Sequence, residues 1–350
     1  MIKIKSENLK EFFKKSKFIK PALSNPVLSN IKVECAGNTC KLTKTNLNHY
    51  CIYDTKIENN YDGSFLLNER DIASFINSIN PEYITIQLEE KRLIISDGNK
   101  TKKFSEMEDV NNFPVYKKEI EEAVNIPRDV IESLYIAKEY AKKDMVGHPA
   151  SFVHLKNNEV FASNAFAAYY KKFNYDLPEI LFYPEMCFAL VGLGNVGYYK
   201  SGNYSVFTAE NILFGFISTE ASPMDYGRVI GVLVNSKGFT IDKAELIKFC
   251  EFTINSATNE NPISALKNSN GEFISIEFNG SLGMGGTKME VEVVKEGEII
   301  EYNFNPKILL PGLKAIPYDY IHITQNPKYG IIIHNEHDLD YAGVFMPFIK

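Results

Sequence analysis

The sequence repeats itself over a long distance, and this repeat restricts the possible folds more than any other feature. Four pairs of identical residues are each 237 positions apart: Leu9 and Leu246, Phe12 and Phe249, Asn68 and Asn305, and Tyr83 and Tyr320. Half of this offset is about 118, and an intermediate copy of the same pattern lies close to that distance. The repeat therefore predicts three similar domains.

Each copy contains two stretches with the apolar spacing of an amphipathic helix. The longer helices are predicted near residues 6–20, 127–144 and 242–258, and the shorter ones over residues 68–80, 183–194 and 305–316. Asn68 and Asn305 are good N-cap residues, and Pro184 and Pro306 suit the first helical turn. Pro311 lies inside the last of these helices, where a proline is expected to kink or shorten it.

Between the predicted helices, short alternating strands are separated by turns that contain glycine or asparagine. Residues 111–115 and 221–225 each hold a proline and are the predicted connectors. We therefore predict an α+β chain with domains at residues 1–117, 118–232 and 233–350. Each domain should contain a helix, several antiparallel strands, a second helix and several more strands.

The charge balance restricts how this chain could meet nucleic acid. Its 350 residues include 38 basic and 44 acidic side chains, which give a formal net charge of −6. A general nucleic-acid binder should be basic, so any contact with DNA requires a local basic surface. Only four basic residues are arginines, and lysine suits phosphates better than base edges. Contact that ignores the base sequence is therefore favoured.

The cysteines and the first residues indicate the compartment. Five cysteines without a C-x-x-C pair predict reduced thiols in the cytoplasm. Cys35 and Cys40 are expected to face each other across a hairpin turn as core residues. The first residues predict a strand and a lysine-rich helix rather than a signal peptide, and no apolar stretch approaches the length of a membrane span.

Three local motifs add a resemblance to a known family. The chain has NPVLSN at residues 25–30, DYGRV at 225–229 and VFMPFI at 344–349. These are similar to an L-P-I-L-x-N-like run, a D-Y-R-R-V linker and a terminal V-M-P-[MIV]-[RK]-L. With the length and the threefold repeat, the sequence resembles a divergent bacterial sliding clamp, the beta subunit of DNA polymerase III. One departure is SNAFAA at residues 163–168, where the family carries a T-D-G-H-R-L-like strand.

The resemblance implies three clamp domains in a crescent, and a head-to-tail homodimer that closes into a ring with helices inside and sheets outside. It implies a processivity factor, not an enzyme, that encircles double-stranded DNA without sequence preference. Its partners would be the DNA polymerase III alpha subunit, the clamp loader and other proteins that dock through short peptides. No catalytic residue, cofactor, metal or membrane contact is expected, and the location would be cytoplasmic.

The resemblance also implies three sites. The residues expected to face DNA are Lys10, Lys14, Lys17, Lys20, Arg70, Lys142, Lys143 and His148, of which Lys10, Lys14 and Lys17 have the spacing of one helix face. The expected partner groove comprises Ala165, Phe166, Ala168, Pro223, Met224, Val229, Val344, Phe345, Met346, Pro347, Phe348 and Ile349. Because the strand at residues 163–168 is largely small and apolar, the groove should favour hydrophobic anchors and bind standard clamp-binding peptides weakly.

The third site is the dimer interface. The edge strand at residues 102–107 is expected to pair with an edge near residues 252–256 of a second copy. Phe104, Met107 and Ile254 would supply the apolar contacts, because buried aromatic and aliphatic residues dominate such interfaces.

The residues alone leave two other functions open, a repeat-built scaffold that never meets DNA and a nucleotide-cofactor enzyme. The enzyme hypothesis depends on Gly192, Gly194 and Gly197, which fit G-x-G-x-x-G. That motif requires a strand before it and a helix after it, whereas here a helical pattern precedes it. Residues 334–340 have the side chains of a metal site, but a polar hairpin loop predicts the same residues.

Overall fold

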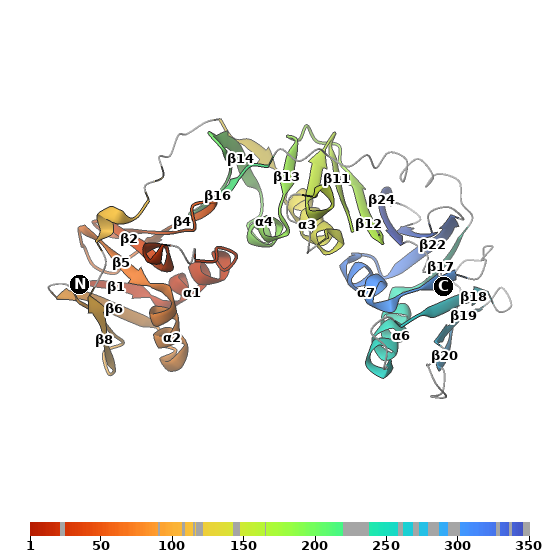
Figure 1. Cartoon of the computed structure of the whole chain (residues 1–350), viewed down its shortest axis with the longest axis horizontal. Coiled ribbons are helices and arrows are strands. Elements are labelled where there is room, and N and C mark those ends of the chain that lie inside the picture. The colour runs from red at the N-terminus through yellow and green to blue at the C-terminus, as the bar shows by residue number, and fades with distance from the viewer. Residues whose placement is uncertain are drawn as a thin grey trace. The chain divides into compact units, whose positions relative to one another are not determined.

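The computed structural model describes residues 1–350 with gaps. The residues outside the description are 22–24, 90–91, 107–108, 115, 117–121, 143–147, 165, 220–237, 258–261, 269–272, 279–286, 293–301, 327–329, 336–337 and 346–350. Within the described residues, one order of elements occurs three times: a strand, an α-helix, four strands, a second α-helix and three strands (Figure 1).

The bounds of these elements are as follows. The first set is β1 (Ile2–Lys5), α1 (Ser6–Lys15), η1 (Pro26–Ser29), β2 (Asn30–Ala36), β3 (Thr39–Thr45), β4 (His49–Lys56), β5 (Gly63–Asn68), α2 (Glu69–Ile79), β6 (Tyr83–Glu89), β7 (Arg92–Ser96), β8 (Thr101–Glu106) and η2 (Val110–Asn112). The second is β9 (Val124–Ile126), α3 (Arg128–Ala137), η3 (Lys138–Tyr140), η4 (Pro149–Ser151), β10 (Val153–Lys156), β11 (Glu159–Ser163), β12 (Ala167–Lys172), β13 (Ile180–Phe182), α4 (Pro184–Leu190), β14 (Val196–Ser201), β15 (Tyr204–Ala209) and β16 (Ile212–Ile217). The third is β17 (Gly238–Asp242), α6 (Lys243–Ser256), β18 (Ser264–Asn268), β19 (Phe273–Phe278), β20 (Thr287–Glu292), β21 (Tyr302–Phe304), α7 (Pro306–Ala315), β22 (Tyr320–Asn326), β23 (Gly330–Asn335) and β24 (Asp338–Phe345).

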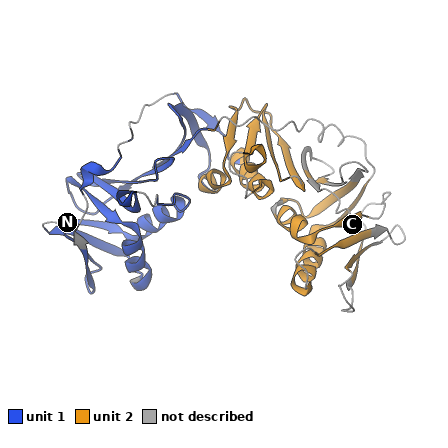
Figure 2. Cartoon of the chain, viewed as in Figure 1, with its two compact units in different colours: residues 1–128, 192–218 blue, residues 129–191, 219–350 orange. Residues whose placement is uncertain are grey.

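The chain divides into two compact units (Figure 2). Unit 1 comprises residues 1–128 and 192–218, and unit 2 comprises residues 129–191 and 219–350. This division cuts through the predicted middle domain, so the boundaries at residues 117 and 232 stay a prediction. The reason for the division lies in the sheets, which extend from one set of elements into the next.

Each unit contains one sheet of eight strands and one of four. In unit 1 the orders are β5-β2-β3-β4-β16-β15-β14-β9 and β1-β6-β7-β8. In unit 2 they are β13-β10-β11-β12-β24-β23-β22-β17 and β20-β19-β18-β21. Antiparallel pairing of β4 with β16, and of β12 with β24, joins the two halves of each large sheet.

The helices begin where the repeat predicts, although some end earlier. Helices α6 and α7 and strand β22 each begin 237 residues after α1, α2 and β6. Helix α1 ends at Lys15 rather than near residue 20, and Ser16 is its C-cap, with its N–H bonded to the carbonyl of Phe12. Pro311 does not shorten α7, which runs for ten residues with this exposed proline inside it.

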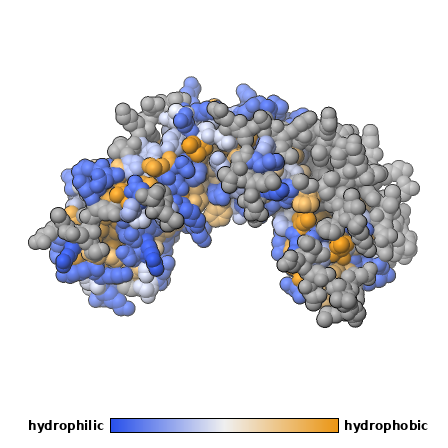
Figure 3. Space-filling model, in the orientation of Figure 1, coloured by the Kyte–Doolittle hydropathy of each residue, from blue (hydrophilic) through white to orange (hydrophobic). Residues whose placement is uncertain are grey.

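The core of each unit lies where helices cover the strands. Leu9 and Phe12 of α1 are fully buried, and the ring of Phe12 lies 6.0 Å from that of Tyr53 on β4. Hydrophilic residues cover most of the described surface on the face drawn in Figure 3. The large apolar side chains that stay exposed include Phe166, Phe252 and Tyr320. None of the described helices has the length and apolarity needed to cross a membrane.

Candidate nucleic-acid interface and partner groove

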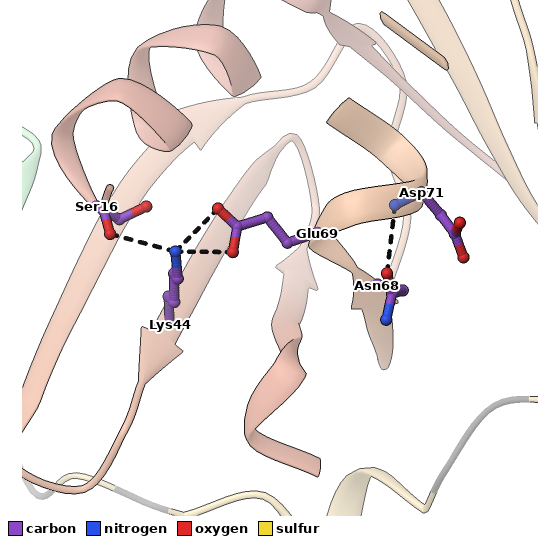
Figure 4. Close-up of polar contacts among 5 residues, drawn as sticks. All are labelled: Ser16, Lys44, Asn68, Glu69 and Asp71. Atoms are coloured by element: carbon purple, nitrogen blue, oxygen red, sulfur yellow. Dashed lines mark hydrogen bonds and ion pairs between the residues drawn. The ribbon is translucent and has the colours of Figure 1, made fainter. Parts of the chain in front are cut away.

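Helices α1 and α2 of unit 1 are linked at one end by a buried lysine (Figure 4). The ammonium group of Lys44 on β3 donates hydrogen bonds to the carbonyl oxygen of Ser16, at 3.2 Å, and to Oε1 of Glu69, at 2.8 Å. Ser16 caps the C-terminus of α1 and Glu69 begins α2. A buried charge is costly unless it is paired and hydrogen-bonded, and here the end of one helix and the start of the next supply the partners.

A second contact joins the opposite end of α2 to α1. Lys10 donates a hydrogen bond from Nζ to the side-chain oxygen of Asn80. Asn80 ends α2 in the left-handed conformation, with a φ of 51°, which asparagine tolerates better than most residues. The two helices are therefore linked at two places, and the Lys10 ammonium already has a protein partner.

The remaining predicted cations of unit 1 are exposed. Lys14 lies in the last turn of α1, Lys17 and Lys20 follow that helix, and Arg70 lies in the first turn of α2. Lys14 and Arg70 therefore lie near the place where Lys44 links the end of α1 to the start of α2. The expectation that Lys17 shares a helix face with Lys10 and Lys14 is wrong, because the helix ends at Lys15.

Two lysines near this surface escaped the sequence analysis. Lys15 is half-buried, and burial lowers the pKa of its ammonium group. The ammonium nitrogen of Lys15 lies close to Gly192, since a Cβ atom added to this glycine would be 3.9 Å from it. Lys44 gave no signal at all, since a lysine on a strand is normally read as solvent-exposed.

The predicted DNA-facing residues of unit 2 lie around Ala150. The backbone N–H of Lys142 donates to the Ala150 carbonyl at 2.7 Å, and Nδ1 of the exposed His148 accepts from the Ala150 N–H at 3.1 Å. Lys142 and His148 are thus held close together by one residue. Lys143 lies outside the described residues.

The partner groove is predicted at the junction of β12 and β24 in unit 2. In this antiparallel pair Ala168 faces Val344, and Ala167 faces Phe345. Phe166 lies in the turn before β12, where Oδ1 of Asn164 accepts from its N–H at 2.9 Å, and 55% of its surface is exposed. The structure thus brings Ala168, Val344 and Phe345 together in the sheet, with Phe166 in the turn that precedes β12.

The other predicted groove residues cannot be placed. They are Ala165, Pro223, Met224, Val229, Met346, Pro347, Phe348 and Ile349, which lie outside the described residues.

The predicted dimer contact needs one correction. Strand β8 is indeed the edge of its four-stranded sheet, and the Lys102 ammonium lies 5.0 Å from the centre of the Phe104 ring. However, residues 252–256 form the end of helix α6, so they cannot offer a strand edge as expected. Ile254 lies half-buried on that helix, and Met107 lies outside the described residues.

The geometry of the glycine motif does not suit a dinucleotide. Helix α4 precedes Gly192, and Gly197 lies within strand β14, whereas a dinucleotide site needs a strand before the glycines and a helix after them. Gly192 and Gly194 have φ values of 80° and 76°, which fit a helix-ending turn. In the part of the chain that the structure describes, no group of three or more His, Cys, Asp or Glu residues could hold a metal ion.

Comparison with known proteins agrees with this architecture. Residues 2–117 match the family model of the DNA polymerase III beta subunit, N-terminal domain. No curated protein sequence matches the chain.

Solved sliding clamps match the whole structure. The Pseudomonas aeruginosa clamp bound to griselimycin has a TM-score of 0.85 and 19% identity, with 99% of each chain covered. The Bacillus subtilis clamp has a TM-score of 0.83 and 17% identity, covering 100% of this chain and 99% of that one. The beta subunit of Streptococcus pyogenes has a TM-score of 0.84 and 16% identity, with 100% of each chain covered. The predicted resemblance is therefore confirmed: the chain has the sliding-clamp fold from end to end, and its residues 2–117 carry the sequence signature of the DNA polymerase III beta subunit family.

Proposed function

We propose that this chain is a DNA sliding clamp, a non-catalytic processivity factor that encircles duplex DNA and tethers a polymerase. The observation that carries the proposal is the threefold element order joined by strand pairing. Strands β4, β12 and β20 hold equivalent places in the three sets, and so do β8, β16 and β24. A strand of the first kind can pair with a strand of the second kind from the next set, and we call such a pairing a joint. Two of the three possible joints, β4 with β16 and β12 with β24, exist within the chain.

The third joint supplies a rule for ring closure. Strands β8 and β20 are both edge strands of their four-stranded sheets. An open edge strand presents unpaired backbone groups, and closure removes this liability. By the logic of the other two joints, β8 of one copy pairs with β20 of a second copy, and the reciprocal pair closes a head-to-tail homodimer of six clamp domains.

The charges of the two edges support this pairing. Strand β8 carries exposed Lys102 and Lys103, while β20 carries exposed Glu290 and Glu292. Each strand also has one residue of the opposite sign, Glu106 and Lys288. Opposite charges across paired strands stabilise an antiparallel ladder, so β8 and β20 are better suited to each other than either is to itself.

The proposed DNA contact is electrostatic and independent of sequence. The exposed cations Lys14, Lys17, Lys20 and Arg70 of unit 1, with Lys142, Lys143 and His148 of unit 2, would meet phosphates. Phosphate contacts position a protein on DNA without reading bases. Few and weak contacts of this kind would allow the ring to slide.

The proposed partner groove lies over the joint of β12 and β24. Its occupants would be short peptides of the DNA polymerase III alpha subunit, the clamp loader and other clamp-binding proteins in the cytoplasm. Phe166, exposed beside the small residues Ala167 and Ala168, would favour peptides with large hydrophobic anchors. Standard clamp-binding peptides would bind weakly.

One experiment tests the function. The mass of the native protein is measured by light scattering after size exclusion, and its retention is compared on circular and linearised DNA after loading. A clamp should be a dimer that stays on circular DNA and is lost from the ends of linear DNA. Equal retention on both forms would indicate ordinary binding, and no retention on either would indicate a repeat-built scaffold that does not meet DNA.

A further inference from the structure

Two cysteines face each other directly in the β2–β3 hairpin of unit 1. Cys35 on β2 pairs with Cys40 on β3, and the turn between these strands begins at Gly37 with a φ of 60°. The pair continues the buried row formed by Val33 and Leu42. Because cross-strand neighbours share one face of a sheet, the hairpin directs both thiols to the same place.

The two sulfur atoms are in contact. Sγ of Cys35 lies 2.7 Å from Sγ of Cys40, and both cysteines are free. A disulfide needs Cα atoms about 4.4–6.8 Å apart, and directly opposed residues of an antiparallel pair are separated by about 4.5–5.5 Å. The backbone is thus suited to a disulfide without rearrangement.

Small molecules can approach this pair. Both cysteines line a cavity of about 1000 Å³ in unit 1, together with Lys5, Lys41 and Lys56. Cys35 keeps 7% of its surface exposed and Cys40 keeps 2%. Glu34, Asp54 and Glu58 line the same cavity, so the charges of the lysines are balanced there.

The two thiols differ in acidity. A hydrogen bond from Cys40 lowers the pKa of the Cys35 thiol, and the same bond together with burial raises the pKa of the Cys40 thiol. Burial also raises the pKa of the thiols of Cys51, Cys187 and Cys250. Since the thiolate is the nucleophile, Cys35 is the cysteine expected to react first.

We propose that Cys35 and Cys40 form a redox-active dithiol that a hydroperoxide converts into a cross-strand disulfide. The thiolate of Cys35 attacks the terminal peroxide oxygen and the O–O bond breaks. The leaving group is hydroxide, which takes a proton to become water, or for an organic hydroperoxide an alkoxide, which becomes an alcohol. This leaves a sulfenic acid on Cys35. The sulfur of Cys40 then attacks the sulfur of Cys35, the S–O bond breaks, and water leaves. Two thiols are oxidised and one peroxide is reduced, and a dithiol reductant reverses the change.

The test uses the reduced full-length chain and hydrogen peroxide. After alkylation under denaturing conditions, intact mass and peptide mapping should show a loss of two hydrogen atoms, located in the peptides that carry Cys35 and Cys40. Cys51, Cys187 and Cys250 should be alkylated as in the untreated protein. Reaction of all five cysteines at similar rates, or crosslinks between chains only, would overturn the proposal without any variant being made.

Two variants then assign the order of steps. Cys40→Ser should stop at a sulfenic acid on Cys35 that a dimedone probe captures, whereas Cys35→Ser should give neither that adduct nor the disulfide. Cys51→Ala is the matched control for a buried cysteine and should form the disulfide as the parent does. Dimedone capture at Cys40 in Cys35→Ser, at the rate seen for Cys35 in Cys40→Ser, would contradict the assignment of Cys35 as the reactive thiol.

Discussion

The ammonium nitrogen of Lys44 lies 2.7 Å from Oε2 of Glu69, and the Lys44 side chain is only 4% exposed. This cation is therefore held between a helix start and the Ser16 carbonyl at a helix end (Figure 4). The negative end of the α1 dipole favours a cation at that carbonyl. The contact positions the two helices that carry Lys14 and Arg70, two of the exposed cations proposed to meet DNA.

Replacing Lys44 should destabilise unit 1 strongly. Lys44→Met removes the charge and leaves Glu69 partly buried without its cation, which costs about 3–5 kcal/mol of unfolding free energy in comparable buried pairs. Urea denaturation measures this cost. Lys248→Ala is the control, because it breaks an exposed ion pair with Glu245 at 2.6 Å that should contribute less than about 0.5 kcal/mol. If both variants lose the same unfolding free energy, Lys44 contributes no more to stability than an exposed ion pair does.

The charges of the two open edges predict how the dimer can be broken and restored. Lys102→Glu with Lys103→Glu should give a folded monomer, and so should Glu290→Lys with Glu292→Lys, because like charges then face each other at both joints. Such juxtaposition costs several kcal/mol. Mixing the two variants should restore a dimer, since one joint then carries exchanged charges and the other the original ones. Analytical ultracentrifugation measures the mass of each charge-reversed variant and of their mixture. A mixture that stays monomeric would rule out pairing of β8 with β20.

The proposed DNA contact predicts different effects for the lysines in and just after helix α1. Lys14→Ala with Lys17→Ala should weaken retention on DNA for all sequences alike and reduce the slope of log affinity against log salt by roughly 2, about 1 for each phosphate contact. Lys10→Ala should have a smaller effect, since Asn80 already binds its ammonium. Lys172→Ala with Lys200→Ala removes the same charge from exposed strand positions. An equal change of slope in this control would mean that net charge alone governs binding.

Two tyrosines, one buried and one half-buried, predict how the stability of unit 1 responds to alkali. Burial, reinforced by a 2.8 Å hydrogen bond to Glu11, raises the pKa of Tyr53 to about 12, and burial raises that of Tyr116 to about 12. A raised pKa means that folding favours the neutral hydroxyl. Its contribution is therefore complete below pH about 10, the ordinary tyrosine value, and is lost as the pH rises through about 12.

Urea unfolding at a series of pH values checks this sign. Tyr53→Phe with Tyr116→Phe should lose less stability between pH 10 and 12 than the parent chain. Tyr320→Phe is the control, because 55% of the surface of this tyrosine is exposed to solvent. A double variant that loses as much stability as the parent over this range would show that other groups control the alkaline transition.

The sequence predicts local elements well and long-range pairing poorly. The 237-residue repeat predicts the starts of α1, α2, α6 and α7, because apolar spacing and N-caps depend on residues that are close together in the sequence. The end of α1 at Lys15 was missed, since lysines continue past the residue where helical geometry stops. The joints of β4 with β16 and of β12 with β24 depend on contacts between strands more than 150 residues apart, and periodicity carries no information on such partners.

Among the candidate site residues, too, the sequence predicts those that local features reveal and misses those that depend on long-range contacts. Exposed cations such as Lys14 and Arg70 could be named from charge and spacing. Lys44 could not, because only the tertiary structure brings Ser16 and Glu69 to it. The expectation that residues 252–256 form a strand edge is wrong, because their apolar spacing continues the pattern of helix α6, which ends at Ser256.

Phe166 is the residue that tests the proposed partner groove. An exposed aromatic beside small residues is a typical anchor of a peptide site, and its truncation should cost about 2 kcal/mol of binding, roughly 30-fold in affinity. Phe166→Ala should therefore weaken binding of a peptide with hydrophobic anchors while the unfolding temperature stays unchanged. Tyr320→Ala is the matched control, because Tyr320 is also 55% exposed but lies on β22, separated from β12 by two strands.

Variants of the C-terminal tail, residues 344–349, distinguish a role in peptide binding from a role in the core of the domain. Met346→Ala with Phe348→Ala should abolish peptide binding while the dimer and its thermal stability survive, because proline at position 347 should stop the strand and leave the following side chains to meet a partner. Methionine suits such a surface, since its flexible thioether adapts to different peptides. Calorimetric titration measures peptide binding, and thermal unfolding of the same samples measures stability. If peptide binding and thermal stability fall together, the tail completes the core of its domain and Phe166 alone marks the groove.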